Sequence, residues 1–267
     1  MTFTIQPHQH CQAQLEQGIL TIAIDRAESK NALYGDLYLY IAQLLDNADQ
    51  SNDVRCVILR GANQDFTAGN DMQDFMSYFK QPSSQGKAGE LPPFVLIKSV
   101  AKFSKPLILA IKGVAVGIGV TLTLHADLVY ADDSAIFQMP FVSLGLSPEG
   151  GIGRLMSQQI GYHHTAELLF TAKKFNRQTA EKINLINSLP DGVDVYDYAL
   201  QTAQHLVQLP LASLKQSKTL MKHNIAETLA YIDDEAEIFM QRVQSPETKE
   251  AVTAFMEKRK PNFSQFA

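Results

Sequence analysis

Residues 137–153 read F-Q-M-P-F-V-S-L-G-L-S-P-E-G-G-I-G, and the rest of the chain is organised around the acid in this stretch, Glu149. Aromatic and aliphatic residues precede Glu149, and three of the next four residues are glycines. A carboxyl group in apolar surroundings resists ionisation, so its pKa moves toward the range in which a base can take up and return a proton. The alternative is a carboxylate that stabilises the start of a helix expected over residues 152–160. These residues alone leave both roles open.

Length and charge limit the classes of protein that the chain can represent. With 267 residues, 45% of them hydrophobic, it can bury a substantial core as one domain, with or without a helical appendage. The formal net charge of −5 argues against a general nucleic-acid binder, which carries a basic excess on its binding face. An anionic ligand would have to meet a local basic patch.

The cysteines, histidines and apolar runs indicate neither a metal site nor a membrane protein. Cys11 and Cys56 lack C-x-x-C spacing, which favours buried free thiols over a zinc site or a disulfide. The seven histidines form no metal-ligand pattern, and His163 and His164 fit a surface turn. No signal-peptide pattern or apolar run of membrane-spanning length occurs, so we expect a cytoplasmic protein that does not bind membranes.

Alternating strand and helix patterns predict an α/β fold with a parallel sheet. Residues 11–16 alternate, and Gly18 leads into the mainly apolar residues 19–25, so two short strands joined around Gln17 and Gly18 predict a β-hairpin. Further strands are expected over 53–61, 105–113, 127–131 and 134–138, and helices over 37–46, 72–79 and 93–103. The polar, Gly- and Ser-containing residues 81–91 predict a mobile surface loop. From residue 150 onward the pattern is mainly helical, with breaks near Pro190, Pro210 and Pro246.

Two glycine-containing loops each connect an expected strand to an expected helix: residues 60–72, R-G-A-N-Q-D-F-T-A-G-N-D-M, and residues 112–121, K-G-V-A-V-G-I-G-V-T. The second loop is expected to run into an apolar helix buried on all sides. Unpaired backbone N–H groups at two helix starts can form an oxyanion hole. Tight turns with close helix packing would explain the glycines equally simply. Dinucleotide, P-loop and G-x-S-x-G patterns do not occur, and Leu122 stands where the dinucleotide motif needs its third glycine.

Four segments follow one another along the chain: F-T-A-G-N-D-M, K-G-V-A-V-G-I-G-V-T-L, H-A-D-L-V-Y-A and P-F-V-S-L-G-L-S-P-E-G-G. In this order they resemble the crotonase (enoyl-CoA hydratase/isomerase) superfamily. The resemblance covers nearly the whole chain. It implies a ClpP-like α/β spiral of ββα repeats over residues 1–200, followed by a C-terminal helical trimerisation region over 201–267. It also implies a homotrimer or a dimer of trimers.

The same resemblance implies site residues. The two oxyanion-hole donors fall on the backbone N–H groups of Ala68 and Ile118. The two glutamates of enoyl-CoA hydratases match Thr121 and Phe141, neither of which is an acid or a base. The motif S-P-E-G-G is similar to that of the Δ3,Δ2-enoyl-CoA isomerase branch, whose catalytic glutamate matches Glu149. His125 and Asp127 are expected to be structural.

Coenzyme A would enter as part of an acyl-CoA substrate, and no separate cofactor is expected. Its nucleotide end would meet Arg26, Lys30 and Lys258, although lysines and arginines are most often solvated surface charges. The thioester end would lie against residues from both glycine loops, namely Ala68, Gly69, Asn70, Asp71, Met72 and Gly117. Helix capping is the alternative role for Asn70 and Asp71.

The resemblance therefore implies an enoyl-CoA isomerase of fatty acid degradation that moves a double bond from C3 to C2 by proton transfer through Glu149. Phe141, Met139 and Val142 would form a wall that excludes water, and residues 81–91 would shape the acyl end of the pocket. Two alternatives remain open. One is another crotonase-superfamily activity, such as dienoyl isomerisation or hydration, and the other is a non-catalytic acyl-CoA-binding protein.

Overall fold

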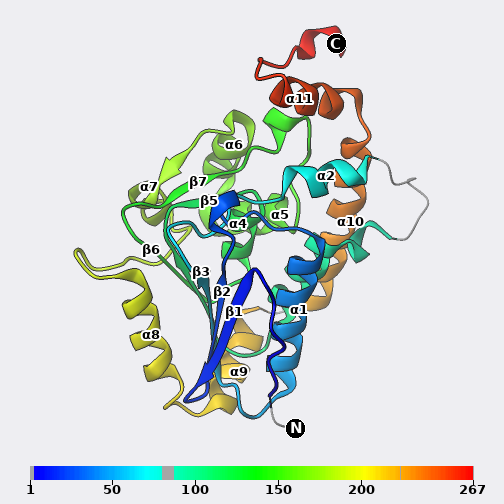
Figure 1. The fold of residues 1–267 in the computed structure, drawn as a ribbon. Coiled ribbons are helices and arrows are strands. Elements are labelled where there is room, and N and C mark those ends of the chain that lie inside the picture. The colour runs from blue at the N-terminus through cyan, green and yellow to red at the C-terminus, as the bar shows by residue number, and fades with distance from the viewer. Residues whose placement is uncertain (1–2, 80–86, 223, 267) are drawn as a thin grey trace.

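The computed structural model describes residues 3–79, 87–222 and 224–266 (Figure 1). The main sheet has five strands in the order β1-β2-β3-β4-β6. β1 and β2 pair antiparallel, which confirms the predicted hairpin, and the other neighbours pair parallel. The strands are β1 (Cys11–Glu16), β2 (Ile19–Ile24), β3 (Cys56–Gly61), β4 (Leu107–Ile111) and β6 (Leu128–Ala131).

Both faces of this sheet are apolar because helices cover both. In β4 every residue is buried, with Leu107, Leu109 and Ile111 in the main core and Ile108 and Ala110 in a second, smaller cluster. Continuous apolar strands of this kind are typical of parallel sheets buried on both sides. Helix α8 (Val195–Leu206) packs on the side of the smaller cluster, opposite the helices α1 (Gly35–Gln50), α3 (Pro92–Lys102) and α10 (Ile225–Val243) (Figure 1).

A second sheet has the order β5-β7-β8, with β5 (Val114–Val116), β7 (Ile136–Gln138) and β8 (Phe175–Asn176). The sequence predicted one strand over 105–113, whereas the chain turns at Gly113 and contributes β5 to the other sheet. The apolar helix expected after the second glycine loop is buried as predicted. It is short, however, because α4 (Ile118–Thr121) gives way at once to a 3₁₀ turn, Leu122–Leu124.

From residue 150 onward the regular elements are helices apart from the short strand β8. Pro190 lies between α7 (Arg177–Lys182) and α8, Pro210 caps α9 (Leu211–Met221), and Pro246 is the first residue of α11 (Pro246–Met256), so the predicted breaks are confirmed. Position 200, where we expected the core to end, lies inside α8. The other helices are α2 (Met72–Tyr78), α5 (Ile152–Ile160) and α6 (Tyr162–Thr171).

Several features expected from the sequence can be located in this fold. Cys11 and Cys56 are free and buried, as expected, and burial raises the pKa of each thiol to about 12. Part of the loop expected over residues 81–91 lies outside the described residues, and Ala88–Glu90 at its end forms a 3₁₀ turn. No helix among the described residues has both the length and the apolar composition needed to cross a bilayer.

Candidate active site

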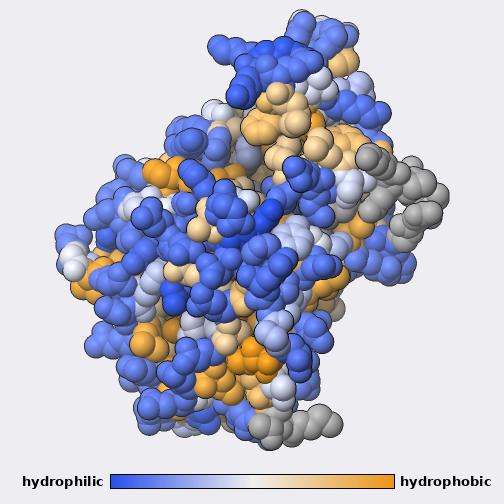
Figure 2. All heavy atoms as spheres, in the orientation of Figure 1, coloured by the Kyte–Doolittle hydropathy of each residue, from blue (hydrophilic) through white to orange (hydrophobic). Residues whose placement is uncertain are grey.

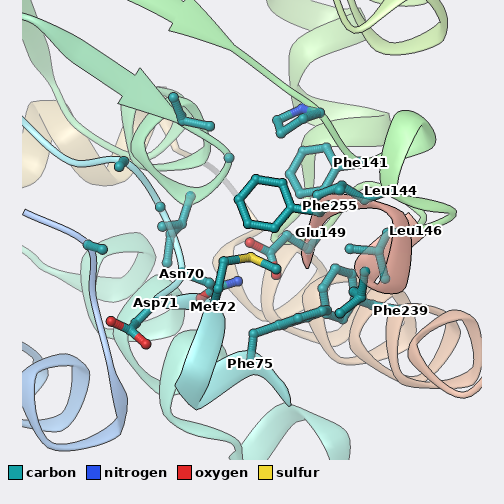
Figure 3. A pocket seen from close by; sticks show the side chains of 18 of the residues that line it. Asn70, Asp71, Met72, Phe75, Phe141, Leu144, Leu146, Glu149, Phe239 and Phe255 are labelled. Atoms are coloured by element: carbon teal, nitrogen blue, oxygen red, sulfur yellow. The ribbon is translucent and has the colours of Figure 1, made fainter. Parts of the chain in front are cut away.

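A cavity of about 480 Å³ lies where the two glycine loops meet α2, α10 and α11 (Figure 3). Most of its wall is apolar, and Glu149 is its buried acid. Figure 2 shows hydrophobic side chains gathered beneath the C-terminal segment, on the side of the molecule where Figure 1 places α2 and α11. Large apolar side chains that line the cavity are Met72, Phe75, Phe141, Leu144, Phe239 and Phe255.

The two glycine loops lie side by side because a short parallel bridge joins them. Thr67 pairs with Ala115, with hydrogen bonds from Thr67 N to Val114 O (2.9 Å) and from Val116 N to Thr67 O (3.0 Å). Gly69 has φ +90°, and a Cβ atom there would lie 2.9 Å from Val116 O, so only glycine permits this approach. Three residues beyond each bridge partner, Asn70 and Ile118 occupy equivalent places in the two loops, and both line the cavity.

The backbone hydrogen bonds correct one predicted oxyanion-hole donor. The Ala68 N–H donates to Lys30 O at 2.9 Å, so the prediction that it points to the substrate is wrong in this structure. Asn70 N–H takes part in no hydrogen bond between described residues, although both neighbouring amides do. Ile118 is the first residue of α4, where the N–H group has no acceptor within its own helix. The candidate pair of donors is therefore Asn70 N and Ile118 N.

Side-chain packing holds these two amides in place. Ile118 is 1% exposed, and its side chain belongs to the main core, so its bulk does not prevent the backbone from facing the cavity. The side-chain oxygen of Asn70 accepts a hydrogen bond from the hydroxyl of buried Tyr38. Both donors thus come from segments that are fixed on the side away from the cavity.

Glu149 is 1% exposed, and neither of its carboxyl oxygens has a hydrogen-bond partner among the described residues. Figure 3 shows this carboxyl group pointing into the space that the apolar side chains surround. Burial, together with the negative charge of Glu235, raises the pKa of Glu149 to about 8. A buried acid without hydrogen bonds costs stability, so its presence at a cavity indicates a functional group.

The positions that match the two hydratase glutamates hold no acid. Thr121 is fully buried, and its hydroxyl donates to Gly117 O at 3.4 Å. Phe141 is 5% exposed and forms part of the apolar wall. The other two residues expected in that wall do not line the cavity, since Met139 is fully buried elsewhere in the core and Val142 is 44% exposed, so this part of the prediction is wrong.

The structure separates the predicted coenzyme A contacts into two groups. The cavity is lined by all the residues expected at the thioester end, namely Ala68, Gly69, Asn70, Asp71, Met72 and Gly117. The three basic residues expected at the nucleotide end do not line it: Arg26, Lys30 and Lys258. Lys30 and Lys258 are exposed, and residues close to them in the chain, Ser29 and Phe255, contribute to the lining.

Arg26 and Asp71 are paired with each other. Arg26 Nη1 lies 2.7 Å from Asp71 Oδ2. Asp71 also caps α2 by accepting hydrogen bonds from the backbone of Gln73 (2.9 Å) and Asp74 (3.1 Å). Burial opposes ionisation of Asp71, but these hydrogen bonds lower its pKa overall. The capping role of Asp71 is thus confirmed, and Arg26 is held by this pair.

His125 and Asp127 are structural, as predicted. His125 Nε2 lies 2.7 Å from Gly150 O, and because a carbonyl can only accept, Nε2 carries the proton. Burial lowers the pKa of His125 to about 4, which keeps the ring neutral. Asp127 accepts hydrogen bonds from Leu107 N (2.8 Å) and Lys218 Nζ (2.6 Å).

No cluster of three or more potential metal ligands occurs among residues 3–79, 87–222 and 224–266.

Comparison with known proteins identifies the family. Residues 14–266 match the family described as enoyl-CoA hydratase/isomerase. The chain belongs to this family. It is 30% identical to the 1,2-epoxyphenylacetyl-CoA isomerase of Escherichia coli K12 over 94% of this chain and 97% of that one. It is also 30% identical to the enoyl-CoA delta isomerase 2 of Rattus norvegicus, over 92% of this chain and 63% of that one.

A solved structure shows the same fold. The crystal structure of an enoyl-CoA hydratase/isomerase from Acinetobacter baumannii superposes with a TM-score of 0.86, at 62% identity, covering 90% of this chain and all of that one. The predicted crotonase fold is therefore confirmed, and the chain is an enzyme of the crotonase superfamily.

Proposed function

We propose that this enzyme is a Δ3,Δ2-enoyl-CoA isomerase that uses Glu149 as its single acid and base. The observation that carries the proposal is the buried, unpaired carboxyl group of Glu149 in a mainly apolar cavity, opposite the loops that present Asn70 N and Ile118 N. Addition of water by the two-glutamate route needs acids at the positions that Thr121 and Phe141 occupy.

The proposed reaction begins with a 3-enoyl-CoA whose C1 oxygen accepts hydrogen bonds from the two loop amides. The Glu149 carboxylate takes a proton from C2, and the electron pair of that C–H bond forms a dienolate whose charge rests on the C1 oxygen. The protonated Glu149 then returns its proton to C4, and the double bond comes to lie between C2 and C3. Preorganised amides and a positioned base together favour this path, because negative charge develops where the donors already point.

The apolar wall has a defined role in this scheme. Phe141, Phe239 and Phe255 line the space around the carboxyl group and leave water few polar partners. Exclusion of water retains the proton on Glu149 between the two transfers and protects the product from hydration.

The test is a pair of assays. With 3-hexenoyl-CoA we expect the absorbance of a conjugated thioester to appear, and with crotonyl-CoA we expect no loss of that absorbance. Glu149→Gln should abolish the first reaction while still binding coenzyme A thioesters. Hydration of crotonyl-CoA at a rate equal to or above isomerisation would instead assign the enzyme to the hydratase activity of the family. Isomerisation that survives Glu149→Gln would exclude Glu149 as the base.

A further inference from the structure

A second buried acid, Glu235, binds the backbone that directly follows the catalytic candidate. Glu235 of α10 is 7% exposed, and its two carboxyl oxygens accept hydrogen bonds from the backbone of the segment that follows Glu149. Gly151 N lies 2.6 Å from Glu235 Oε2, and Gly153 N lies 3.1 Å from Glu235 Oε1. Helix α5 has no side-chain cap of its own, so Glu235 supplies its N-terminal cap from another helix.

The glycines of this segment are needed for the contact. A Cβ atom at Gly153 would lie 3.0 Å from Glu235 Oε1 and 3.2 Å from the Tyr231 hydroxyl. From the other direction, Nε2 of buried His125 donates to Gly150 O. The backbone of residues 150–153 is thus held on both sides by side chains that do not line the cavity.

Burial makes this arrangement costly, which argues for a role beyond packing. Burial raises the pKa of Glu235 to about 7, even though the hydrogen bonds from Gly151 and Gly153 favour its ionised form. A glutamine of the same size would avoid the cost of a buried charge, but it could accept only through its single oxygen.

The Tyr231 side chain also hydrogen-bonds to Glu235 and favours its ionised form. Tyr231 is its neighbour on α10, and Arg154 of α5 lies over the Tyr231 ring and pairs with Glu227 at 2.5 Å. The acids Asp233 and Glu237 of α10 are engaged elsewhere, by Lys98 of α3 and by the backbone of Ala88.

We propose that Glu235 is a positioning residue for Glu149: by capping Gly151 and Gly153 it fixes the turn that aims the Glu149 carboxyl group into the cavity, and it places a second acidic group behind that turn. This inference rests on the proposed role of Glu149 as the base. The side chain of Glu235 does not line the cavity and need not touch the substrate.

The test compares Glu235→Gln and Glu235→Asp with a matched control, Asp233→Asn, which removes one negative charge from the same helix at an exposed ion pair. For Glu235→Gln we expect kcat to fall by about 10- to 100-fold, as for a misplaced catalytic group, with KM nearly unchanged. The rise of activity with pH should also move to lower pH, since Glu149 loses a negative neighbour. Glu235→Asp should lower kcat but leave the pH profile in place, because it keeps the charge. Asp233→Asn should change neither.

A second measurement does not depend on catalysis. Thermal stability is measured as a function of pH for four proteins: the unsubstituted chain, Glu149→Gln, Glu235→Gln and the double variant. We expect Glu149→Gln to change stability in a pH-dependent way, and we expect this change to be smaller when the chain also carries Glu235→Gln. A difference that stays the same, together with an unmoved pH profile and a kcat within twofold of the unsubstituted enzyme, would overturn the proposal. If the chain has no isomerase activity, the proposed function fails, and this measurement still decides whether Glu235 acts on Glu149.

Discussion

At the scale of single residues, Glu149 is a base because of where it lies. Its carboxyl group is buried and has no hydrogen-bond donor among the described residues, so nothing local stabilises its charged form. The pKa of about 8 follows from that burial and from the negative neighbour Glu235. A developing enolate held by two amides is the kind of electron sink that such a base needs.

The first residue-scale prediction concerns the pH dependence of activity. The reaction needs the ionised form of Glu149, so kcat/KM should rise tenfold per pH unit below about pH 8 and level off above it. Initial rates with 3-hexenoyl-CoA between pH 6 and 9.5 measure this profile. A rise centred near pH 4.5, the pKa of an unperturbed glutamate, would show that the acting carboxyl group is not buried.

The second residue-scale prediction concerns stability. The folded chain holds the Glu149 proton up to about pH 8, whereas the unfolded chain loses it near pH 4.5, so the stability contribution is present at low pH and declines between these values. Each pKa unit corresponds to about 1.4 kcal/mol. Glu149→Gln should therefore become more stable than the unsubstituted chain as the pH rises from 5 to 8.5, by up to several kcal/mol. Thermal unfolding followed by circular dichroism measures the difference, and a constant difference across this range would contradict the burial argument.

Sequence reasoning located Glu149 because its apolar neighbours are adjacent in the chain. The donor amide was placed two residues too early, at Ala68, because letters do not show which N–H is already bonded, here to Lys30 O. Glu235 was missed because it approaches Gly151 from 84 residues away. One signal was present: Glu235 lies among the buried residues Ile232, Ala236 and Phe239, as an acid on the apolar face of a helix.

At the scale of elements, the site depends on two strand-to-helix loops held in register. The bridge between Thr67 and Ala115 makes the loops a single unit and brings the first amide of α4 beside Asn70. The hairpin strand β1 and the helices α1 and α3 were predictable from hydrophobic periods that repeat over several residues, and β3 and β4 were predictable from their short apolar runs. β5 was not predicted because it follows β4 directly after the turn at Gly113, so the letters of the two strands read as one apolar run, and β8 was not predicted because it has only two residues.

The element-scale prediction tests the Ile118 amide. Proline is tolerated at the first position of a helix and has no N–H, so Ile118→Pro removes one donor while α4 can still form. We expect kcat to fall by about 10²- to 10³-fold, as when one oxyanion-hole donor is removed. Ile118→Val keeps the amide and removes one methylene from the core, so it should lower stability by about 0.5–1.5 kcal/mol and leave kcat nearly unchanged. Equal rates for the two variants would exclude this amide from the site.

At the scale of the whole molecule, the C-terminal helices contribute to both the site and the surface. Phe239 of α10 and Phe255 of α11 line the cavity, so this region completes the pocket built by the sheet and loops. The same region also exposes several large apolar side chains. In α9, α10 and α11 they are Leu220, Met221, Ile238, Phe255 and Met256.

The whole-molecule prediction, which follows from the family resemblance, is that the chain forms a homotrimer or a pair of trimers in which some of these apolar side chains are covered. Light scattering after size exclusion should give three or six times the chain mass of 29.6 kDa. Replacing Leu220 and Met221, which are 71% and 74% exposed and do not line the cavity, by serine should weaken assembly without changing the fold. A mass of one chain at micromolar concentration would contradict the prediction.

The most direct test of the central claim follows the proton itself. A 3-hexenoyl-CoA carrying deuterium at C2 is converted in ordinary water, and the product is analysed by mass spectrometry and NMR for deuterium at C4. Transfer by one carboxyl group in a cavity closed to water predicts deuterium at C4 in a substantial share of the first product formed. Product that carries only solvent protium at C4 from the earliest time points would contradict the claim that Glu149 itself carries the proton from C2 to C4.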